Sequence, residues 1–269
     1  MDALSPDAEI IEWCKRATPD HLLSNPISGN KVLRLNESLV VKFGFLLSED
    51  EARSQMSAYE ILDPAIFQDS ESLGYIIMDY MEGEQKDAVN TTDQVRDMSR
   101  ILQHLASHKS QKPGPLGGGP SSCLLFRASD DSTFASVEDL EAWFNMRLFD
   151  RAGQVSFQQM ELVLCHLDLF PRNSLWLDGQ PPCVLDWATA GFYPRLFERC
   201  SQLCTQRPEL NKVVLDQPVS KSEALQVELV LQASWHEVKY CFRPPPPEEI
   251  VLPWVDPSEL LPRRYIRRN

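Results

Sequence analysis

The amino-acid sequence predicts an α+β protein of two lobes, a small lobe built on an antiparallel sheet and a larger, mainly helical lobe. Short apolar runs of strand type mark the first part of the chain, and apolar residues at helical spacing mark most of the rest. The composition is that of an ordinary globular protein, with 43% hydrophobic and 24% charged residues. We therefore expect a sheet lobe at residues 1–82 and a helical lobe at residues 83–269.

The first lobe shows apolar runs separated by turn residues, which is typical of strands. A polar stretch between two of these runs predicts a helix over about 48–62, because Ser48 can cap it and Glu51 follows three residues later. We expect strands at 31–35, 39–43 and 75–81, with a short amphipathic helix ahead of them at 8–16.

In the second lobe, apolar residues recur on one face of several segments, which indicates helices. We expect a helix capped by Thr92 and further helices that begin at Ser136 (to about Asp150), at Gln158 (to Cys165) and at Ser222 (to about Phe242). The Pro- and Gly-rich stretch 109–122 predicts a loop, and the prolines from 244 to 247 end the last helix and leave an extended tail. Short strands at 174–177 and 183–187 flank the turn dipeptide Asp178-Gly179 and predict a hairpin.

The charge balance is acidic, with a net charge of −13 and a pI near 4.8. This argues against a general nucleic-acid binder, which needs clustered Lys and Arg for phosphates. A basic run at 263–268 is interpreted as a solvated terminus, with a targeting or contact tail as the alternative. Seven cysteines without a CxxC pair, no signal-like stretch and no apolar run long enough for a bilayer predict a cytoplasmic protein with no membrane contact.

One polar loop carries the residue types that phosphoryl transfer needs. His166-Leu-Asp168-Leu-Phe-Pro-Arg-Asn173 places an Asp and an Asn five residues apart, and Asp186 follows at the far end of the expected hairpin. Such a reaction needs a carboxylate near the acceptor hydroxyl and oxygen ligands for a metal on the phosphates. Because Mg²⁺ prefers oxygen ligands, we expect Asn173 and Asp186 around the metal and Asp168 facing the acceptor.

The chain resembles the aminoglycoside phosphotransferase and choline kinase family, and within it the fungal branch of phosphotransferase-family proteins. The similarity runs in order over roughly residues 30 to 200, and it implies a protein-kinase-like fold. The residues that carry it are the loop 166–173, Val184-Leu-Asp-Trp-Ala-Thr-Ala-Gly-Phe-Tyr-Pro-Arg-Leu-Phe-Glu198, Leu39-Val-Val-Lys-Phe-Gly44, Ile76-Ile-Met-Asp-Tyr-Met-Glu-Gly83, Leu116-Gly-Gly-Gly-Pro120 and Phe134-Ala-Ser-Val-Glu-Asp-Leu-Glu-Ala-Trp143.

The resemblance implies a role for each matched position. Asp168 is the catalytic carboxylate, Asn173 and Asp186 bind Mg²⁺, and His166 braces the loop rather than reacting. The nucleotide, ATP or possibly GTP, is held by three further features: Lys42 on its phosphates, Glu51 paired with that lysine (with Glu60 as the competing candidate), and a hinge for the base at Asp79, Tyr80 and Met81.

Two function classes remain open from the sequence. The first is a Mg²⁺-dependent kinase for a hydroxyl group on a small metabolite or antibiotic-like acceptor. The second is a repurposed member that binds a ligand or catalyses another step in a small-molecule pathway. A single glycine, Gly29, precedes the first strand where protein kinases carry a glycine-rich loop. The glycines at 117–119 lack the Gly-Lys-Ser/Thr of a phosphate loop and are interpreted as a flexible connection.

Overall fold

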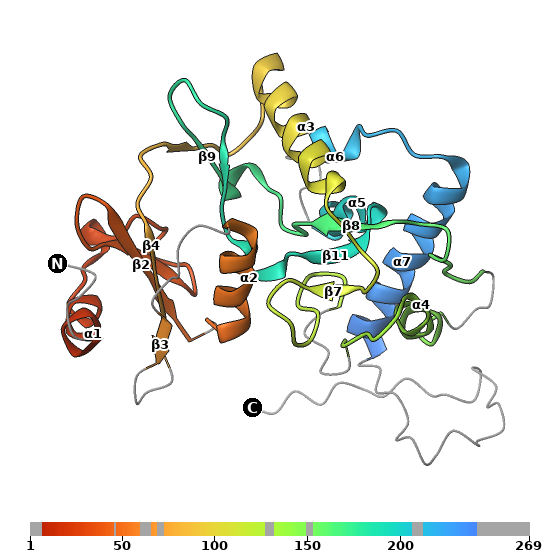
Figure 1. Cartoon of the computed structure of the whole chain (residues 1–269), viewed down its shortest axis with the longest axis horizontal. Helices are drawn as coiled ribbons and strands as arrows, with labels where there is room; N and C mark the ends of the chain where they lie inside the picture. The colour runs from red at the N-terminus through yellow and green to blue at the C-terminus, as the bar shows by residue number, and fades with distance from the viewer. Residues whose placement is uncertain are drawn as a thin grey trace, which may run out of the picture.

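The computed structural model describes residues 7–45, 47–59, 66–68, 73–126, 132–148, 153–205 and 212–240. The described residues form a small sheet lobe followed by a larger lobe that holds most of the helices (Figure 1). The predicted α+β class with two lobes is therefore confirmed. The predicted tail beyond the prolines at 244–247 and the basic run at 263–268 lie outside the described residues.

The first lobe is a four-stranded antiparallel sheet in the order β1-β2-β4-β3. One helix packs on each face: α1 contributes Ile10 and Cys14 to a buried cluster with Val41, and Ala52 of α2 packs against Ile76. The elements are α1 Asp7–Lys15, β1 Lys31–Arg34, β2 Leu39–Gly44, α2 Glu49–Tyr59, β3 Ile66–Gln68 and β4 Gly74–Asp79.

The alternation of side chains along β2 determines where Lys42 points. Successive residues of a strand face opposite sides of the sheet. Val41 is fully buried on the α1 side, so its neighbour Lys42 faces α2. The hairpin register, with Val32 opposite Lys42 and Leu33 opposite Val41, fixes this orientation.

The chain leaves the first sheet after β4 and pairs at once with a strand of the second lobe. β5 (Glu84–Gln85) adds to β9 (Ser174–Trp176), which pairs in turn with β10 (Cys183–Val184). A side chain at Gly83 would lie 2.7 Å from Leu175 Cγ and 2.8 Å from the Trp176 carbonyl oxygen. Glycine therefore permits this close crossing between the lobes.

A third sheet has the order β6-β8-β11-β7 and supports the segments that carry the site. Its strands are β6 Lys109–Ser110, β7 Gly114–Pro115, β8 Leu162–Cys165 and β11 Gly191–Pro194. The helix predicted from Gln158 to Cys165 is wrong, because residues 162–165 form β8, which pairs with β6 and with β11. The stretch 109–122 likewise contains β6 and β7 within the predicted loop.

The core of the second lobe is aromatic. The ring of Phe126 lies 5.3 to 6.2 Å from those of five neighbours, Phe134, Trp143, Phe144, Tyr193 and Phe197. Its helices are α3 Thr92–Ser107, α4 Val137–Asn145, α5 Leu196–Leu203, α6 Lys212–Leu215 and α7 Lys221–Tyr240. The N-cap of α3 is Thr91 rather than Thr92, and α4 ends five residues before the predicted end at Asp150.

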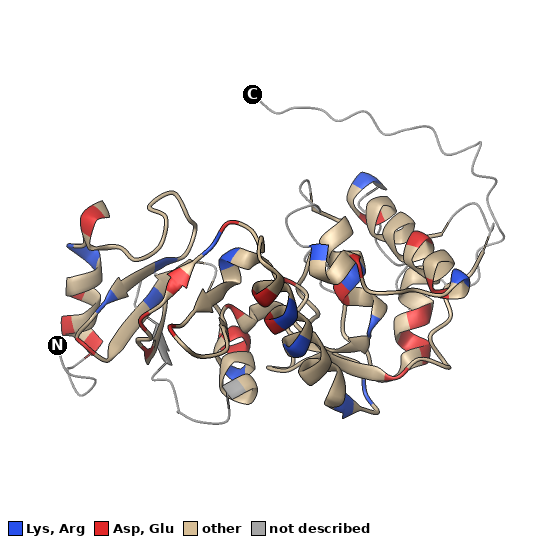
Figure 2. Cartoon of the chain, turned by 90° about the horizontal axis from the view of Figure 1, so that it is seen from above, with Lys and Arg blue, Asp and Glu red and all other residues tan. Residues whose placement is uncertain are grey.

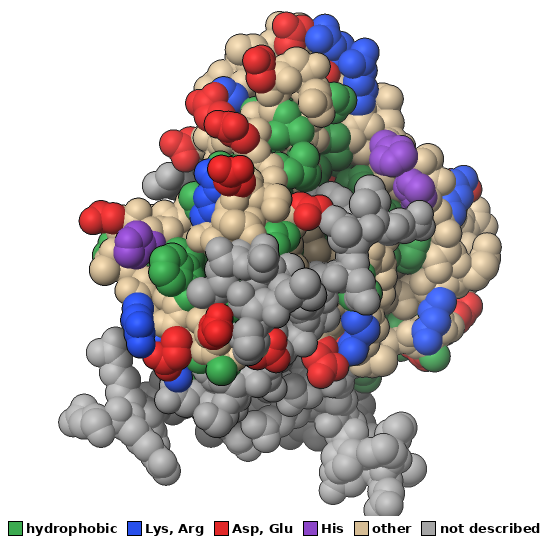
Figure 3. Space-filling model, turned by 60° about the vertical axis from the view of Figure 1, so that its left-hand side comes forward, with side chains coloured by type: hydrophobic (Ala, Val, Ile, Leu, Met, Phe, Trp, Pro, Cys, Tyr) green, Lys and Arg blue, Asp and Glu red, His purple; other side chains and the backbone are tan. Residues whose placement is uncertain are grey.

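Charged side chains of both signs are distributed over both lobes (Figure 2). On the face drawn in Figure 3, acidic groups are scattered among basic ones, and its described side chains form no large basic field. Within the described part of the chain, no helix has the length and apolar character that a membrane span requires.

Candidate active site

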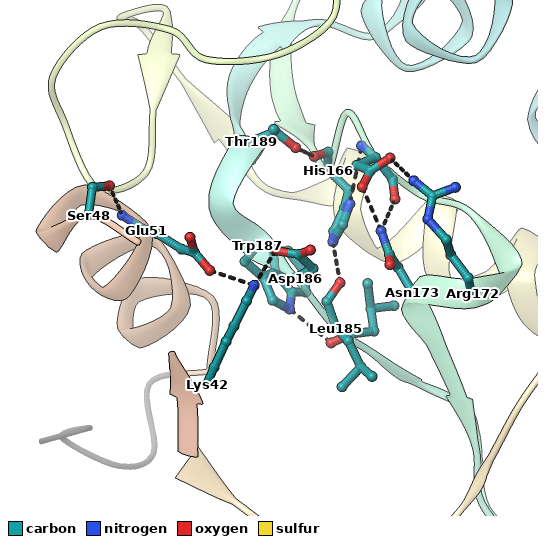
Figure 4. Close-up of polar contacts among 12 residues, drawn as sticks. Lys42, Ser48, Glu51, His166, Arg172, Asn173, Leu185, Asp186, Trp187 and Thr189 are labelled. Carbon is teal, nitrogen blue, oxygen red and sulfur yellow. Dashed lines mark hydrogen bonds and ion pairs between the residues drawn. The ribbon is translucent and has the colours of Figure 1, made fainter. Parts of the chain in front are cut away.

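Lys42 forms two ion pairs, one within the first lobe and one that connects it to the second (Figure 4). Its Nζ lies 2.6 Å from Glu51 Oε1 on α2 and 2.9 Å from Asp186 Oδ1 in the second lobe. The side chains of Lys42 and Glu51 are only 13% and 10% exposed, whereas that of Asp186 is 39% exposed. The structure thus brings together three of the residues that the sequence indicated for nucleotide and metal.

The start of α2 explains why Glu51 is the partner. The Glu51 N–H donates to Ser48 Oγ at 3.1 Å, as expected for an N-cap serine. The Glu51 side chain points instead to Lys42, so its carboxylate forms the ion pair rather than closing a capping box. The competing candidate Glu60 lies outside the described residues.

The buried positions of Lys42 and Glu51 shift their pKa values. Burial works to lower the pKa of Lys42, but attraction to Asp186 and Glu51 outweighs it, so the net pKa is raised and the ammonium stays charged. Burial raises the pKa of Glu51, and the positive charge of Lys42 counteracts only part of that rise. The ion pair with Lys42 therefore favours the carboxylate form of Glu51.

The catalytic-type loop follows β8 and closes on itself through Asn173. The Asn173 side-chain amide donates to the Asp168 carbonyl oxygen at 2.8 Å and to Asp168 Oδ2 at 2.7 Å. Arg172 donates to the other carboxylate oxygen, Oδ1, at 2.8 Å and lies over the Phe170 ring. Leu167 has a φ of 62°, an uncommon conformation for a non-glycine residue that this closed loop maintains.

Burial raises the pKa of Asp168 to about 6, while the Arg172 guanidinium opposes the rise. A carboxylate with that pKa is ionised at pH 7 and is a stronger base than an ordinary aspartate, which suits it to accept a proton from a hydroxyl group.

His166 braces this loop, as the resemblance implied. Its Nδ1 accepts from the Asp168 N–H at 3.3 Å, and its Nε2 donates to the Leu185 carbonyl oxygen at 3.1 Å. Burial lowers its pKa to about 4, so the imidazole is neutral at pH 7. With both ring nitrogens bonded to backbone, His166 ties the loop of Asp168 to the residue before Asp186.

Side chains of α5, for which no role was predicted, hold the backbone of the catalytic-type loop. Glu198 Oε2 accepts from the backbone N–H groups of His166 and Leu167 at 2.8 and 3.1 Å. Ser201 donates to the Leu167 carbonyl oxygen, and Gln202 donates to that of Leu169. Burial raises the pKa of Glu198 to about 7. These contacts are between residues more than 30 positions apart, which no local pattern could reveal.

Asp186 and Asn173 suit a hard cation. Asp186 is partly exposed and has a φ of 66°, and Asn173 uses its amide N–H group on Asp168, which leaves its carbonyl oxygen for a ligand. Among the described residues, no three His, Cys, Asp or Glu side chains cluster as a metal site. Two oxygen donors fit Mg²⁺, which commonly completes its shell with waters and substrate phosphates.

The predicted hinge residues lie where the chain leaves the first sheet. Asp79 ends β4 opposite Leu39, and the Tyr80 N–H donates to the Ser38 carbonyl oxygen at 2.7 Å. The backbone N–H of Tyr80 is therefore already engaged, and Met81, 41% exposed, is the first hinge residue beyond that contact.

The small sheet lobe supplies the pair Lys42 and Glu51, and the helical lobe supplies Asp168 on a loop and Asp186 beside the lysine. This combination defines a phosphotransferase of the kinase-like fold class. The chain belongs to the phosphotransferase enzyme family, whose model matches residues 27–204. The family resemblance seen in the sequence is thereby confirmed, and the chain is a phosphotransferase. None of the curated proteins matches the sequence.

The chain is also similar to solved aminoglycoside phosphotransferases. With APH(4)-Ia it shares 14% identity and a TM-score of 0.50, covering 87% of this chain and 91% of that one. With the GDP and kanamycin complex of APH(2")-IIia it shares 15% identity and a TM-score of 0.49, covering 86% and 89%. At such low identity the similarity concerns the fold alone.

Proposed function

We propose that this protein transfers the γ-phosphate of ATP or GTP to a hydroxyl group of a small molecule in a Mg²⁺-dependent reaction. The observation that carries the proposal is the position of Lys42 Nζ, within 2.9 Å of both Glu51 and Asp186, which lie 9 and 144 positions away in the chain. A buried ammonium held at the junction of the lobes is well placed for the phosphates of a nucleotide.

In this proposal Asp168 acts on the acceptor. Its carboxylate orients the hydroxyl group and takes its proton as the new O–P bond forms and the bond between the γ-phosphorus and the bridging oxygen breaks, releasing the nucleoside diphosphate. Asn173 and Arg172 hold the two carboxylate oxygens in place for this step. Asp186 and the Asn173 carbonyl oxygen would hold Mg²⁺, which when bound neutralises phosphate charge.

The remaining roles follow the same division. Residues 1–82 would bind the nucleotide, with Asp79, Tyr80 and Met81 near the base, and residues 83–269 would carry the catalytic loop and the acceptor site. The acceptor is a hydroxylated metabolite or an antibiotic-like compound, and the reaction takes place in the cytoplasm.

Thermal unfolding with ATP, GTP and ADP, each with and without Mg²⁺, tests nucleotide binding. A ligand that binds only the folded chain raises the melting temperature. At a ligand concentration of a hundred times the dissociation constant, it adds about 2.7 kcal/mol to the free energy of unfolding. No shift with any nucleotide would refute the kinase proposal and favour a repurposed member. Asp168→Ala should abolish transfer and keep nucleotide binding, and loss of binding in that variant would contradict the role given to Asp168.

A further inference from the structure

The glycine loop, Leu116–Gly119, is hydrogen-bonded both to the segment that follows Asp186 and to α2, the helix that carries Glu51. It follows β7, and the Leu116 N–H donates to the Ala190 carbonyl oxygen at 2.9 Å. Ala190 caps the short helical turn Trp187–Thr189 that begins directly after Asp186. One end of the loop is therefore fixed to the segment that positions Asp186.

The other end of the loop is bonded to α2. The Gly117 N–H donates to Ser54 Oγ at 2.9 Å, and Arg53 Nε donates to the Gly117 carbonyl oxygen at 3.1 Å. Ser54 is 1% exposed, so this contact is buried. Both backbone groups of Gly117 are engaged, which differs from the flexible connection predicted from the sequence.

The contact is so close that only glycine fits. A Cβ atom at Gly117 would lie 2.0 Å from the Asp50 carbonyl oxygen, and one at Gly119 would lie 2.6 Å from Asp50 Oδ2. Gly119 also has a φ of +77°, which side-chain-bearing residues rarely adopt. At the intervening Gly118 a Cβ would meet nothing within 4 Å.

We propose that the glycine loop positions α2 so that Glu51 reaches Lys42, and that Gly117 is the positioning residue. Asp50, on which the loop packs, directly precedes Glu51, and α2 lies between the first sheet and the segment with β7 and β11 (Figure 1). If α2 moves away from the loop, the ion pair between Lys42 and Glu51 breaks, and Lys42 keeps only its ion pair with Asp186. The loop thus controls the lysine that the proposed function assigns to nucleotide phosphates, and the inference rests on that function.

The test compares Gly117→Ala with Gly118→Ala in the full chain. Gly118→Ala is a matched control because it adds the same methyl group to the same loop without a clash; its φ of +80° makes it the more strained backbone of the two. Two readouts are taken: hydrogen exchange of the α2 backbone amides without ligand, and the dissociation constants of ATP and ADP with Mg²⁺ by calorimetry. We expect Gly117→Ala alone to speed exchange in α2 and to weaken nucleotide binding by about fivefold or more, the range shown by contacting residues.

A double-mutant cycle separates this role from general destabilisation. If the loop acts through Glu51, Gly117→Ala adds little to the loss of nucleotide affinity already caused by Glu51→Gln, whereas independent effects would multiply. Ser54→Ala removes the hydrogen bond between Gly117 and Ser54 without introducing a clash. It takes the place of Gly117→Ala in the cycle if Gly117→Ala does not fold. Equal α2 exchange in Gly117→Ala and Gly118→Ala, or multiplying effects in the cycle, would overturn the inference. Absence of nucleotide binding in the wild type would instead refute the proposed function, while the exchange readout would still decide the role of the loop.

Discussion

Replacing Lys42 by Met leaves Glu51 as a buried carboxylate without its cation. Removing one partner of a buried ion pair costs about 3–5 kcal/mol. Asp186 is 39% exposed and can regain water, whereas Glu51 at 10% cannot, so we expect the lower end, about 3 kcal/mol, at pH 8. For a chain of this size that lowers the melting temperature by roughly 6–12 °C.

The stability that Lys42→Met loses relative to the wild type should become smaller as the pH falls. Burial already raises the pKa of Glu51, and without Lys42 it rises further. Between 4.5, the ordinary value, and this higher folded-state pKa, the folded chain binds more protons than the unfolded chain. Stability therefore falls as the pH rises through that window, and the variant should lose less at pH 5 than at pH 8.

Calorimetric melting at pH 5 and pH 8 measures both effects. Lys42→Met/Glu51→Gln should recover much of the stability at pH 8, because no charge is then buried at position 51. Lys109→Met serves as a control, since Lys109 pairs with Glu161 on the surface with both side chains more than half exposed, and it should change stability by about 0–1 kcal/mol. A loss of stability that is the same at both pH values, or no larger than that of Lys109→Met, would show that Lys42 does not stabilise a buried Glu51 carboxylate.

Three further predictions concern the second lobe. The acid limb of the pH profile of kcat/KM should lie near pH 6, the pKa of Asp168. Arg172→Met should move this limb to higher pH, because the guanidinium opposes the rise of that pKa. An unchanged limb would show that Asp168 is not the group that accepts the proton. Glu198→Ala should lower kcat by about tenfold or more by releasing the catalytic loop, while Glu198→Gln, whose amide oxygen can still accept from the loop, should retain most activity. Gly191→Ala places a Cβ 2.4 Å from the Gly114 carbonyl oxygen and should cost about 1–3 kcal/mol in thermal unfolding, and a wild-type melting temperature would contradict that packing.

The first lobe could be predicted from sequence because its signals are local. The hairpin depends on the alternation and turn residues between 31 and 44, and the start of α2 depends on Ser48. The position of Lys42 then follows from strand alternation. The family resemblance assigned Lys42, Glu51, Asp168, Asn173 and Asp186 to one site, and the structure places them in the two contacting groups described above.

The strand β8 was predicted as a helix because a short apolar run has no distinguishing period. Leu162-Val-Leu-Cys165 is apolar throughout, and its pairing with β6 and β11 depends on residues at 109–110 and 191–194. Only the position of those partners in space makes the segment a strand.

The hydrogen bonds from α5 to the catalytic loop and from the glycine loop to α2 could not be predicted either, because their partners are far apart in the sequence. Glu198 reaches His166 across 32 positions, and Gly117 reaches Ser54 across 63. In each case a polar side chain satisfies a distant backbone N–H group, a requirement that is set by burial and not by sequence neighbours.

Transfer of labelled phosphate measures the proposed phosphotransferase activity itself. The wild-type chain is incubated with γ-labelled ATP or GTP, Mg²⁺ and a panel of hydroxylated metabolites and aminoglycosides, beside Asp168→Asn at equal nucleotide occupancy. We expect a labelled phosphate ester with the wild type and a rate lower by about a hundredfold or more with Asp168→Asn. Equal labelling by the two proteins, or no labelled acceptor from a wild type saturated with nucleotide, would contradict this expectation.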